Sequence, residues 1–134
     1  MMSELRVPVV SVVIGEAMSG GAMAMGVADY LFMLEYAVFS VISPEGCAAI
    51  LWRDAALSKQ AANIMGITAD ALYEKKLIDE IIAEPAGGAH RDYDKCFLQV
   101  RNAITPVIDR LYNMNIDDLL SKRYHKWMLP SLAE

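Results

Sequence analysis

Apolar residues, most of them β-branched, dominate residues 7–14 of the chain. Such a run predicts a strand buried on both faces, which we place at Val9–Ile14. A glycine-bearing turn follows at Gly15–Gly21, and the Ala/Met-rich residues after it have high helix propensity. The pattern therefore predicts a strand, a tight turn and a short helix over Ser19–Val27.

The later hydrophobic pattern predicts strands that alternate with helices, and then helices alone. The predicted strands are Tyr30–Leu34, Ala37–Val41 and Leu77–Ile82, and the predicted helices are 43–56, Ser58–Met65, Ala69–Lys75, Asp92–Met114 and Ile116–Leu129. Pro106 lies inside the long helix and is expected to kink or interrupt it. This order of elements predicts an α/β class, with one unit at 1–91 and a helical C-terminal extension at 92–134.

Helix boundary signals are clearest at two places. Ser43 is a favoured N-cap residue, Pro44 then occupies the first helical position, and Glu45 lies in the first turn, where acidic residues are favoured. By contrast, Met1–Arg6 has no N-cap before it and Pro8 follows closely, as is typical of the last turn of a helix. We therefore expect the chain to begin inside a larger architecture.

Composition narrows the classes of function. The chain has 134 residues, of which 55% are hydrophobic, and nine Met, which is consistent either with apolar surface shared with a partner or with ordinary core filling. A net charge of −5 without a basic stripe argues against nucleic acid as the main ligand. Cys47 and Cys96 have no metal-ligand spacing and indicate free thiols in a reducing compartment. The sequence predicts no membrane span, and we expect no secretory signal.

The turn at Ser19-Gly20-Gly21 is the first candidate site. The first amides of a helix lack intrahelical acceptors, and glycine lets a ligand approach them closely. An anion or oxyanion site and a merely tight packing of the turn both remain open. The spacing matches no dinucleotide fingerprint, P-loop or nucleophile elbow. Ser19 has no evident His and Asp partners for nucleophilic catalysis.

Other ionisable residues give weaker signals. His90, in a Gly-rich loop, and His125, on an amphipathic helix, are expected to be structural or exposed rather than general bases. Glu16 follows the first strand, where α/β ligand sites tend to lie, and we expect its carboxylate to accept hydrogen bonds from loop amides.

Three segments together carry a family resemblance. They are Gly15–Ala22 with Gly-Glu and Ser-Gly-Gly-Ala, Phe39–Trp52 with Phe-Ser-Val-Ile-Ser-Pro-Glu-Gly-Cys-Ala-Ala-Ile-Leu-Trp, and Leu77–Arg91 with Leu-Ile-Asp-Glu-Ile-Ile-Ala-Glu-Pro-Ala-Gly-Gly-Ala-His-Arg. The chain strongly resembles the α subunit of the bacterial and plastid acetyl-CoA carboxylase carboxyltransferase. The resemblance extends from Met2 to about Met128 and corresponds to the C-terminal half of that subunit.

This resemblance implies a partial crotonase-like fold, built from ββα turns, and a biotin-dependent carboxyltransferase. The family moves CO2 from carboxybiotin, attached to the biotin carboxyl carrier protein, to acetyl-CoA. The product is malonyl-CoA, and this is the first step of fatty acid biosynthesis by a complex that also binds ATP. The α subunit holds biotin as a substrate, while a β subunit holds acetyl-CoA and a zinc ribbon, so no metal is expected in this chain. An α2β2 assembly in the cytoplasm, or in the plastid stroma, is implied.

The family's glycine pair falls on Gly20 and Gly21, whose backbone N–H groups would form an oxyanion hole for biotin. The resemblance also implies substrate-binding roles for Met18, Ser19, Ser43 and Glu45. Where this chain has Ala17 and Met18, the family usually has glycines, so Met18 adds bulk beside the biotin channel.

The resemblance is compatible with three hypotheses about function. We expect carboxyltransferase activity only together with the missing N-terminal half and the β subunit. The alternatives are another crotonase-like acyl-CoA enzyme, such as a decarboxylase or hydratase, and a catalytically incomplete assembly module. A hydratase would need paired glutamate side chains at the site.

Overall fold

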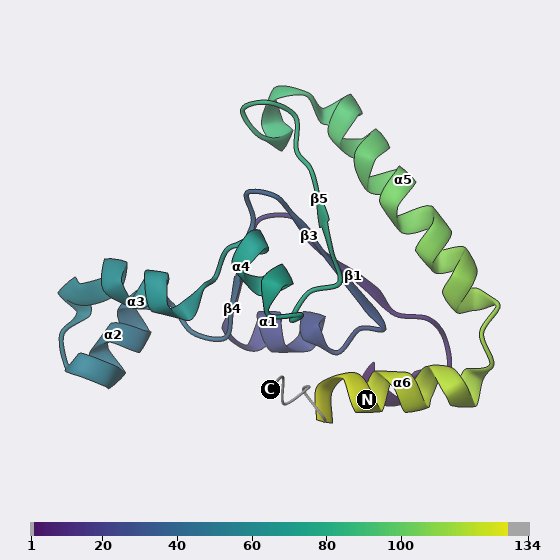
Figure 1. The fold of residues 1–134 in the computed structure, drawn as a ribbon, viewed down its shortest axis with the longest axis horizontal. Helices are drawn as coiled ribbons and strands as arrows, with labels where there is room; N and C mark the ends of the chain where they lie inside the picture. The colour runs from purple at the N-terminus through teal and green to yellow at the C-terminus, as the bar shows by residue number, and fades with distance from the viewer. Residues whose placement is uncertain (1, 129–134) are drawn as a thin grey trace.

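The computed structural model describes residues 2–128, and they form two small parallel sheets with helices around them (Figure 1). The larger sheet has the strand order β1-β3-β5, and the smaller sheet pairs β2 with β4. The strands are β1 (Val10–Val13), β2 (Glu16–Met18), β3 (Tyr30–Leu34), β4 (Val38–Ser40) and β5 (Glu80–Ile82). All three strand pairings are parallel.

The chain steps from the larger sheet to the smaller sheet twice in the same way. β1 leads to β2 and then to α1 (Ser19–Gly26), and β3 leads to β4 and then to further helices. In the register of the two sheets, Val13 lies opposite Met33 and Glu16 lies opposite Val38. The predicted α/β class with ββα turns is therefore confirmed.

The remaining helices lie at the periphery. They are η1 (Met2–Glu4), α2 (Pro44–Trp52), η2 (Ala55–Leu57), α3 (Ser58–Met65), α4 (Ala69–Glu74), η3 (Ala89–Arg91), α5 (Tyr93–Tyr112) and α6 (Ile116–Met128). In Figure 1, α2 and α3 project together away from the sheets, while the long α5 runs along the opposite side. No helix within residues 2–128 is long and apolar enough to cross a membrane.

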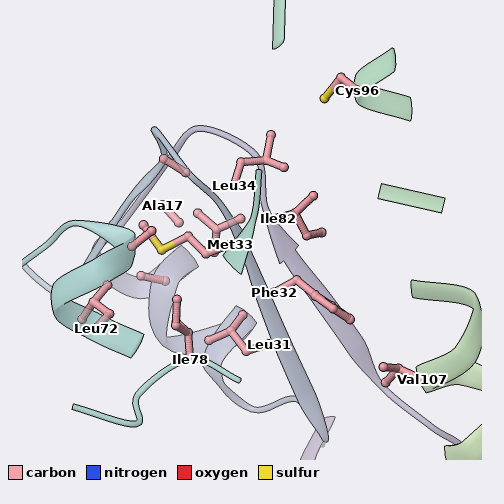
Figure 2. Packing of buried hydrophobic residues seen from close by; sticks show 14 of the residues in the cluster. Ala17, Leu31, Phe32, Met33, Leu34, Leu72, Ile78, Ile82, Cys96 and Val107 are labelled. Carbon is pink, nitrogen blue, oxygen red and sulfur yellow. The ribbon is translucent and has the colours of Figure 1, made fainter. Parts of the chain in front are cut away.

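The core is centred on β3, because it is the middle strand of the larger sheet. Leu31, Phe32 and Met33 are completely buried. Figure 2 shows Leu72 and Ile78 packing near this strand on the side of α4, while Val107 of α5 approaches Phe32 from the other side. Because helices cover both faces of β3, its side chains are buried on both sides, and its sequence is a continuous apolar run.

The first predicted strand is not buried on both faces. Val13 is buried, but Val10–Val12 are half-buried and Ile14 is 75% exposed. The reason is topological, since β1 is an edge strand of the sheet that the structure describes. β-branched composition indicates a strand but does not distinguish an edge position from a central one.

Several predicted boundaries need correction. The predicted turn at Gly15–Gly21 contains strand β2, whose three residues pair with β4. The helix predicted to reach Ala56 ends at Trp52, because Arg53 adopts a left-handed φ of 58°. The strand predicted from Leu77 begins only at Glu80, since the preceding residues complete the turn after α4, with Lys76 at φ 57°.

Helix α5 runs through Pro106 without interruption, so the predicted break is wrong, and the alternative of a kink at Pro106 stays a prediction. Pro106 lies on the exposed side of the helix, and the neighbouring Thr105 hydroxyl donates to the carbonyl of Arg101 at 2.8 Å. At the start of the chain, Met2–Glu4 forms a short 3₁₀ turn rather than the end of an α-helix. The predicted end of the last helix at Leu129 lies outside the described residues.

Candidate functional site

The candidate site begins where β2 passes directly into α1. Met18 ends the strand in an extended conformation, and Ser19 follows with a left-handed φ of 59°, which turns the chain into the helix. No side chain caps α1. Its first amides, which include those of Gly20 and Gly21, therefore lack both an intrahelical acceptor and a capping oxygen.

A pocket of about 310 Å³ opens beside this helix start. Gly21 and Met18 line it, together with Val12–Ala17 and Met25. A Cβ atom built on Gly20 or on Gly21 would meet no atom within 4 Å apart from its own chain neighbours and its own helix backbone. The space in front of this glycine pair is thus open to a ligand. The partial positive charge at the start of a helix favours binding of a negatively charged group there.

A second helix start follows the neighbouring strand. Met18 lies opposite Ser40 in the parallel pairing of β2 and β4, so α1 and the segment before α2 both leave from the carboxyl end of one sheet. Ser43 caps α2, and its Oγ accepts a hydrogen bond of 3.1 Å from the amide of Gly46. Glu45 is exposed in the first turn, as its acidic character predicts.

The structure therefore brings only part of the predicted site together. Met18 and Gly21 line the same pocket, whereas Ser43 and Glu45 do not line it. Gly20 and Ser19 lie in the adjoining first turn of α1. The oxyanion role of Gly20 and Gly21 stays a prediction, as do the substrate-binding roles of Met18, Ser19, Ser43 and Glu45.

Sequence reasoning missed Ser40, which shapes the turn into α2. Ser40 is buried, its hydroxyl donates to the carbonyl of Ile42 at 2.8 Å, and it accepts from the amide of the same residue at 3.4 Å. Gly46 packs against this turn, because a Cβ atom there would lie 3.0 Å from Cγ1 of Ile42. A serine whose hydroxyl bonds the backbone two residues further on is a known turn signal, and it could have indicated this role.

The expected hydrogen bonds of Glu16 to loop amides are absent. Within residues 2–128 its exposed carboxylate has no hydrogen bond. The amide of Val38, the residue opposite Glu16 in β4, donates to the carbonyl of Gly15 at 3.0 Å. Neither histidine lines the pocket beside α1. His125 is exposed, with Nδ1 2.7 Å from the carbonyl oxygen of Ser121, and His90 lines a separate apolar pocket. The pocket thus holds one carboxylate and no imidazole.

The described residues contain no group of three or more His, Cys, Asp or Glu side chains placed to hold a metal ion. Cys47 and Cys96 are both free, and Cys96 is buried. The donors that the structure places at the start of α1 are backbone N–H groups, and the pocket lies beside them.

Comparison with known proteins gives a consistent result. The family model described as acetyl co-enzyme A carboxylase carboxyltransferase-like matches residues 1–130. The chain is similar to acetyl-coenzyme A carboxylase carboxyl transferase subunit alpha from Legionella pneumophila (strain Lens), with 47% identity over 127 residues, and from Alcanivorax borkumensis, with 50% identity. These matches cover 95% of this chain but 40% and 39% of the relatives. The chain thus spans about two fifths of their length.

A solved structure supports the same architecture. The chain is similar to a chain of a Pseudomonas malonate decarboxylase hetero-tetramer, determined in complex with coenzyme A, with a TM-score of 0.69. The match covers 92% of this chain and 49% of the other, at 19% sequence identity. At that identity the likeness concerns the fold, and it agrees with the crotonase-like arrangement predicted from the sequence.

Proposed function

Because the chain belongs to the α-subunit family of acetyl-CoA carboxylase carboxyltransferases, we propose that it carries the biotin side of a carboxyl-transfer site. The reaction transfers CO2 from carboxybiotin to acetyl-CoA and yields malonyl-CoA. The observation that carries this proposal is the uncapped start of α1, where Gly20 and Gly21 face open space.

The donors at α1 suit the ureido group of biotin. Its carbonyl oxygen is a hydrogen-bond acceptor, and the first amides of α1 are donors without a capping side chain. Glycine at both positions leaves room for the ligand to reach them. Val12, Met18 and Met25 provide apolar walls beside these donors.

Carboxybiotin, when bound, supplies the carboxyl group and then a basic ring nitrogen. The role of this chain is to hold the ureido oxygen and to stabilise the negative charge that develops there as the carboxyl group leaves. A donor of this kind typically contributes roughly 2.7–4 kcal/mol to the transition state. The left-handed conformation of Ser19 is a positioning feature, because it directs the first turn of α1 toward the pocket.

The proposed partners follow from the family. They are a β subunit with a zinc ribbon, which holds acetyl-CoA, and the biotin carboxyl carrier protein, in an α2β2 assembly. The named relatives are bacterial, which supports a cytoplasmic location. A hydratase is less well supported, since Glu16 is the only carboxylate that lines the pocket within residues 2–128. A decarboxylase role rests on fold likeness alone.

The experiment is an exchange assay with malonyl-CoA and biocytin. We expect no exchange from the chain alone, and exchange when the β subunit and the remaining part of an α subunit are supplied. Activity of the isolated chain would contradict the requirement for partners. Absence of exchange from the complete mixture, with a full-length relative active in parallel, would contradict the proposed function.

A further inference from the structure

A second pocket, of about 390 Å³, lies between α5 and α6 at the amino end of β3. Four basic side chains line it, namely Arg110, Lys122, Arg123 and Lys126, against the single carboxylate of Asp29. They are four of only twelve Lys and Arg residues in a chain of net charge −5. The pocket is therefore a local concentration of positive charge on an acidic protein.

Two of these cations form a fixed wall. Arg123 is buried and binds both carboxylate oxygens of Asp29, at 2.8 and 2.7 Å. Lys126 pairs with Asp79, which also accepts from the amide of Leu31. In each pair the carboxylate neutralises the cation. These two pairs therefore shape the pocket and do not attract an anionic ligand.

The other two cations, Arg110 and Lys122, have no ion-pair partner within residues 2–128. The guanidinium of Arg110 lies 5.4 Å from the centroid of the Tyr30 ring, a cation–π arrangement that orients it. Lys122 is exposed, one helical turn before Lys126 on α6. Within residues 2–128 neither Arg110 nor Lys122 has a carboxylate within 4.0 Å. The carboxylate of Glu80 accepts a hydrogen bond from the Tyr30 hydroxyl at 3.0 Å, and within residues 2–128 it forms no ion pair with Arg110.

The floor between these cations is apolar. Leu111 and Leu119 are buried there, and Met114 is half-buried beside them. An apolar surface flanked by positive charges suits a ligand with an anionic group and an organic body. Arg and Lys are the usual partners of phosphate groups in proteins, and the volume lies within the ordinary range for small-ligand pockets.

We propose that this pocket binds the phosphate group of a small phosphate ester, with Arg110 and Lys122 as its ligands. The guanidinium supplies a planar pair of N–H donors and the ammonium supplies a second positive charge. The site lies at the amino end of β3, whereas the glycine pocket lies at the carboxyl end of β1, so the two sites are separate. The proposal does not depend on the proposed carboxyl transfer.

The test is calorimetric titration of the 134-residue chain with inorganic pyrophosphate, at low ionic strength. We expect saturable binding, weakened about tenfold by Arg110→Ala and about tenfold by Lys122→Ala. Arg101→Ala and Lys95→Ala are the matched controls, because both residues are exposed on α5 and neither lines the pocket. Circular dichroism of each variant checks that the fold is retained.

Further titrations identify the source of the phosphate. Coenzyme A binding more tightly than pyrophosphate would indicate a nucleotide ester, whereas equal affinities would indicate recognition of the phosphate alone. The proposal is overturned if pyrophosphate does not bind, if succinate binds equally well, or if the two pocket variants bind like the two controls. Carboxyl transfer is not measured, so failure here is distinct from failure of the proposed function.

Discussion

Arg123 and Asp29 form a bidentate, buried ion pair across 94 residues of sequence. The side chains are 1% and 3% exposed. The remaining donors of Arg123 are also used, since Nη1 and Nη2 donate to four carbonyls near the start of the chain: Met2, Ser3, Leu5 and Val7. One guanidinium thus joins α6, the residues before β1 and the residue before β3.

Removal of Arg123 should destabilise the fold strongly. In Arg123→Met the Asp29 carboxylate stays buried without its partner, and loss of one member of such a pair typically costs about 3–5 kcal/mol. Urea unfolding followed by circular dichroism measures the change. Arg101→Met, at an exposed position of α5, is the control and should change stability by less than about 0.5 kcal/mol. Equal stability of the two variants would show that the pair is not needed.

Substitution of Gly21 by Val should abolish carboxyl transfer and leave the fold intact. The new side chain enters open space, so it costs little stability, yet it blocks approach to the first amides of α1. Loss of one oxyanion donor alone lowers the rate roughly 10²–10³-fold. Malonyl-CoA and biocytin exchange in the reconstituted assembly measures this.

Gly26→Ala is the matched control at the other end of α1. Its Cβ atom would lie 3.9 Å from Cζ of Phe39, an ordinary contact. We expect this variant to retain exchange activity. Full activity of Gly21→Val would exclude the assignment of the glycine pair.

Ser43→Ala should reduce the free energy of unfolding by about 1 kcal/mol, because α2 loses its N-cap. Ser43→Asp should restore it, since aspartate is an equally good cap. Ser58→Ala is the control, because Ser58 begins α3 without a capping hydrogen bond. If Ser43 also binds substrate, exchange activity will fall in Ser43→Asp although stability returns. Thermal unfolding and the exchange assay together separate these roles.

Tyr30 should titrate later than an ordinary tyrosine. Its pKa is raised from 10.0 to about 12, first by burial and then by the hydrogen bond to Glu80 and the negative charges of Glu80 and Asp79, while the positive charge of Arg110 opposes the rise. The unfolded chain loses this proton near pH 10, so stability is full below that pH and declines as pH rises toward 12. Phenolate absorbance should show a late-titrating component.

That component should disappear in Tyr30→Phe and persist in Tyr112→Phe, whose tyrosine is 78% exposed. The stability of Tyr30→Phe should also vary less between pH 10 and 12 than that of the unchanged chain. Retention of the late component in Tyr30→Phe would assign it to another group.

Local sequence signals predicted most of the elements because they depend on neighbouring residues. The N-cap at Ser43 and the strand Tyr30–Leu34 follow from composition and spacing alone. Strand β2 could not be predicted in this way, since three residues with one glutamate become a strand only by pairing with β4. The left-handed Ser19 likewise follows from the strand-to-helix turn rather than from serine itself.

The interactions that join distant segments were not predictable from the pattern. Nothing near Arg123 indicates that its partners lie at the opposite end of the chain, and a basic residue on a late helix is ordinarily exposed. The uninterrupted helix at Pro106 also required the structure. For the candidate site, the glycine pair was identified from sequence, whereas its pocket was defined only when Met18 and Met25 were placed beside Gly21.

The repeated step from the larger sheet to the smaller one has a consequence for how this fold varies. Each step contributes one strand to each sheet, and strands pair only with those of adjacent steps. Lengthening such a protein by a whole step would therefore add a new pair of strand contacts without disturbing those already made. Each added step would stack on the previous one, as repeats do in a solenoid protein. The free energy of unfolding should then depend mainly on the interfaces between neighbouring steps.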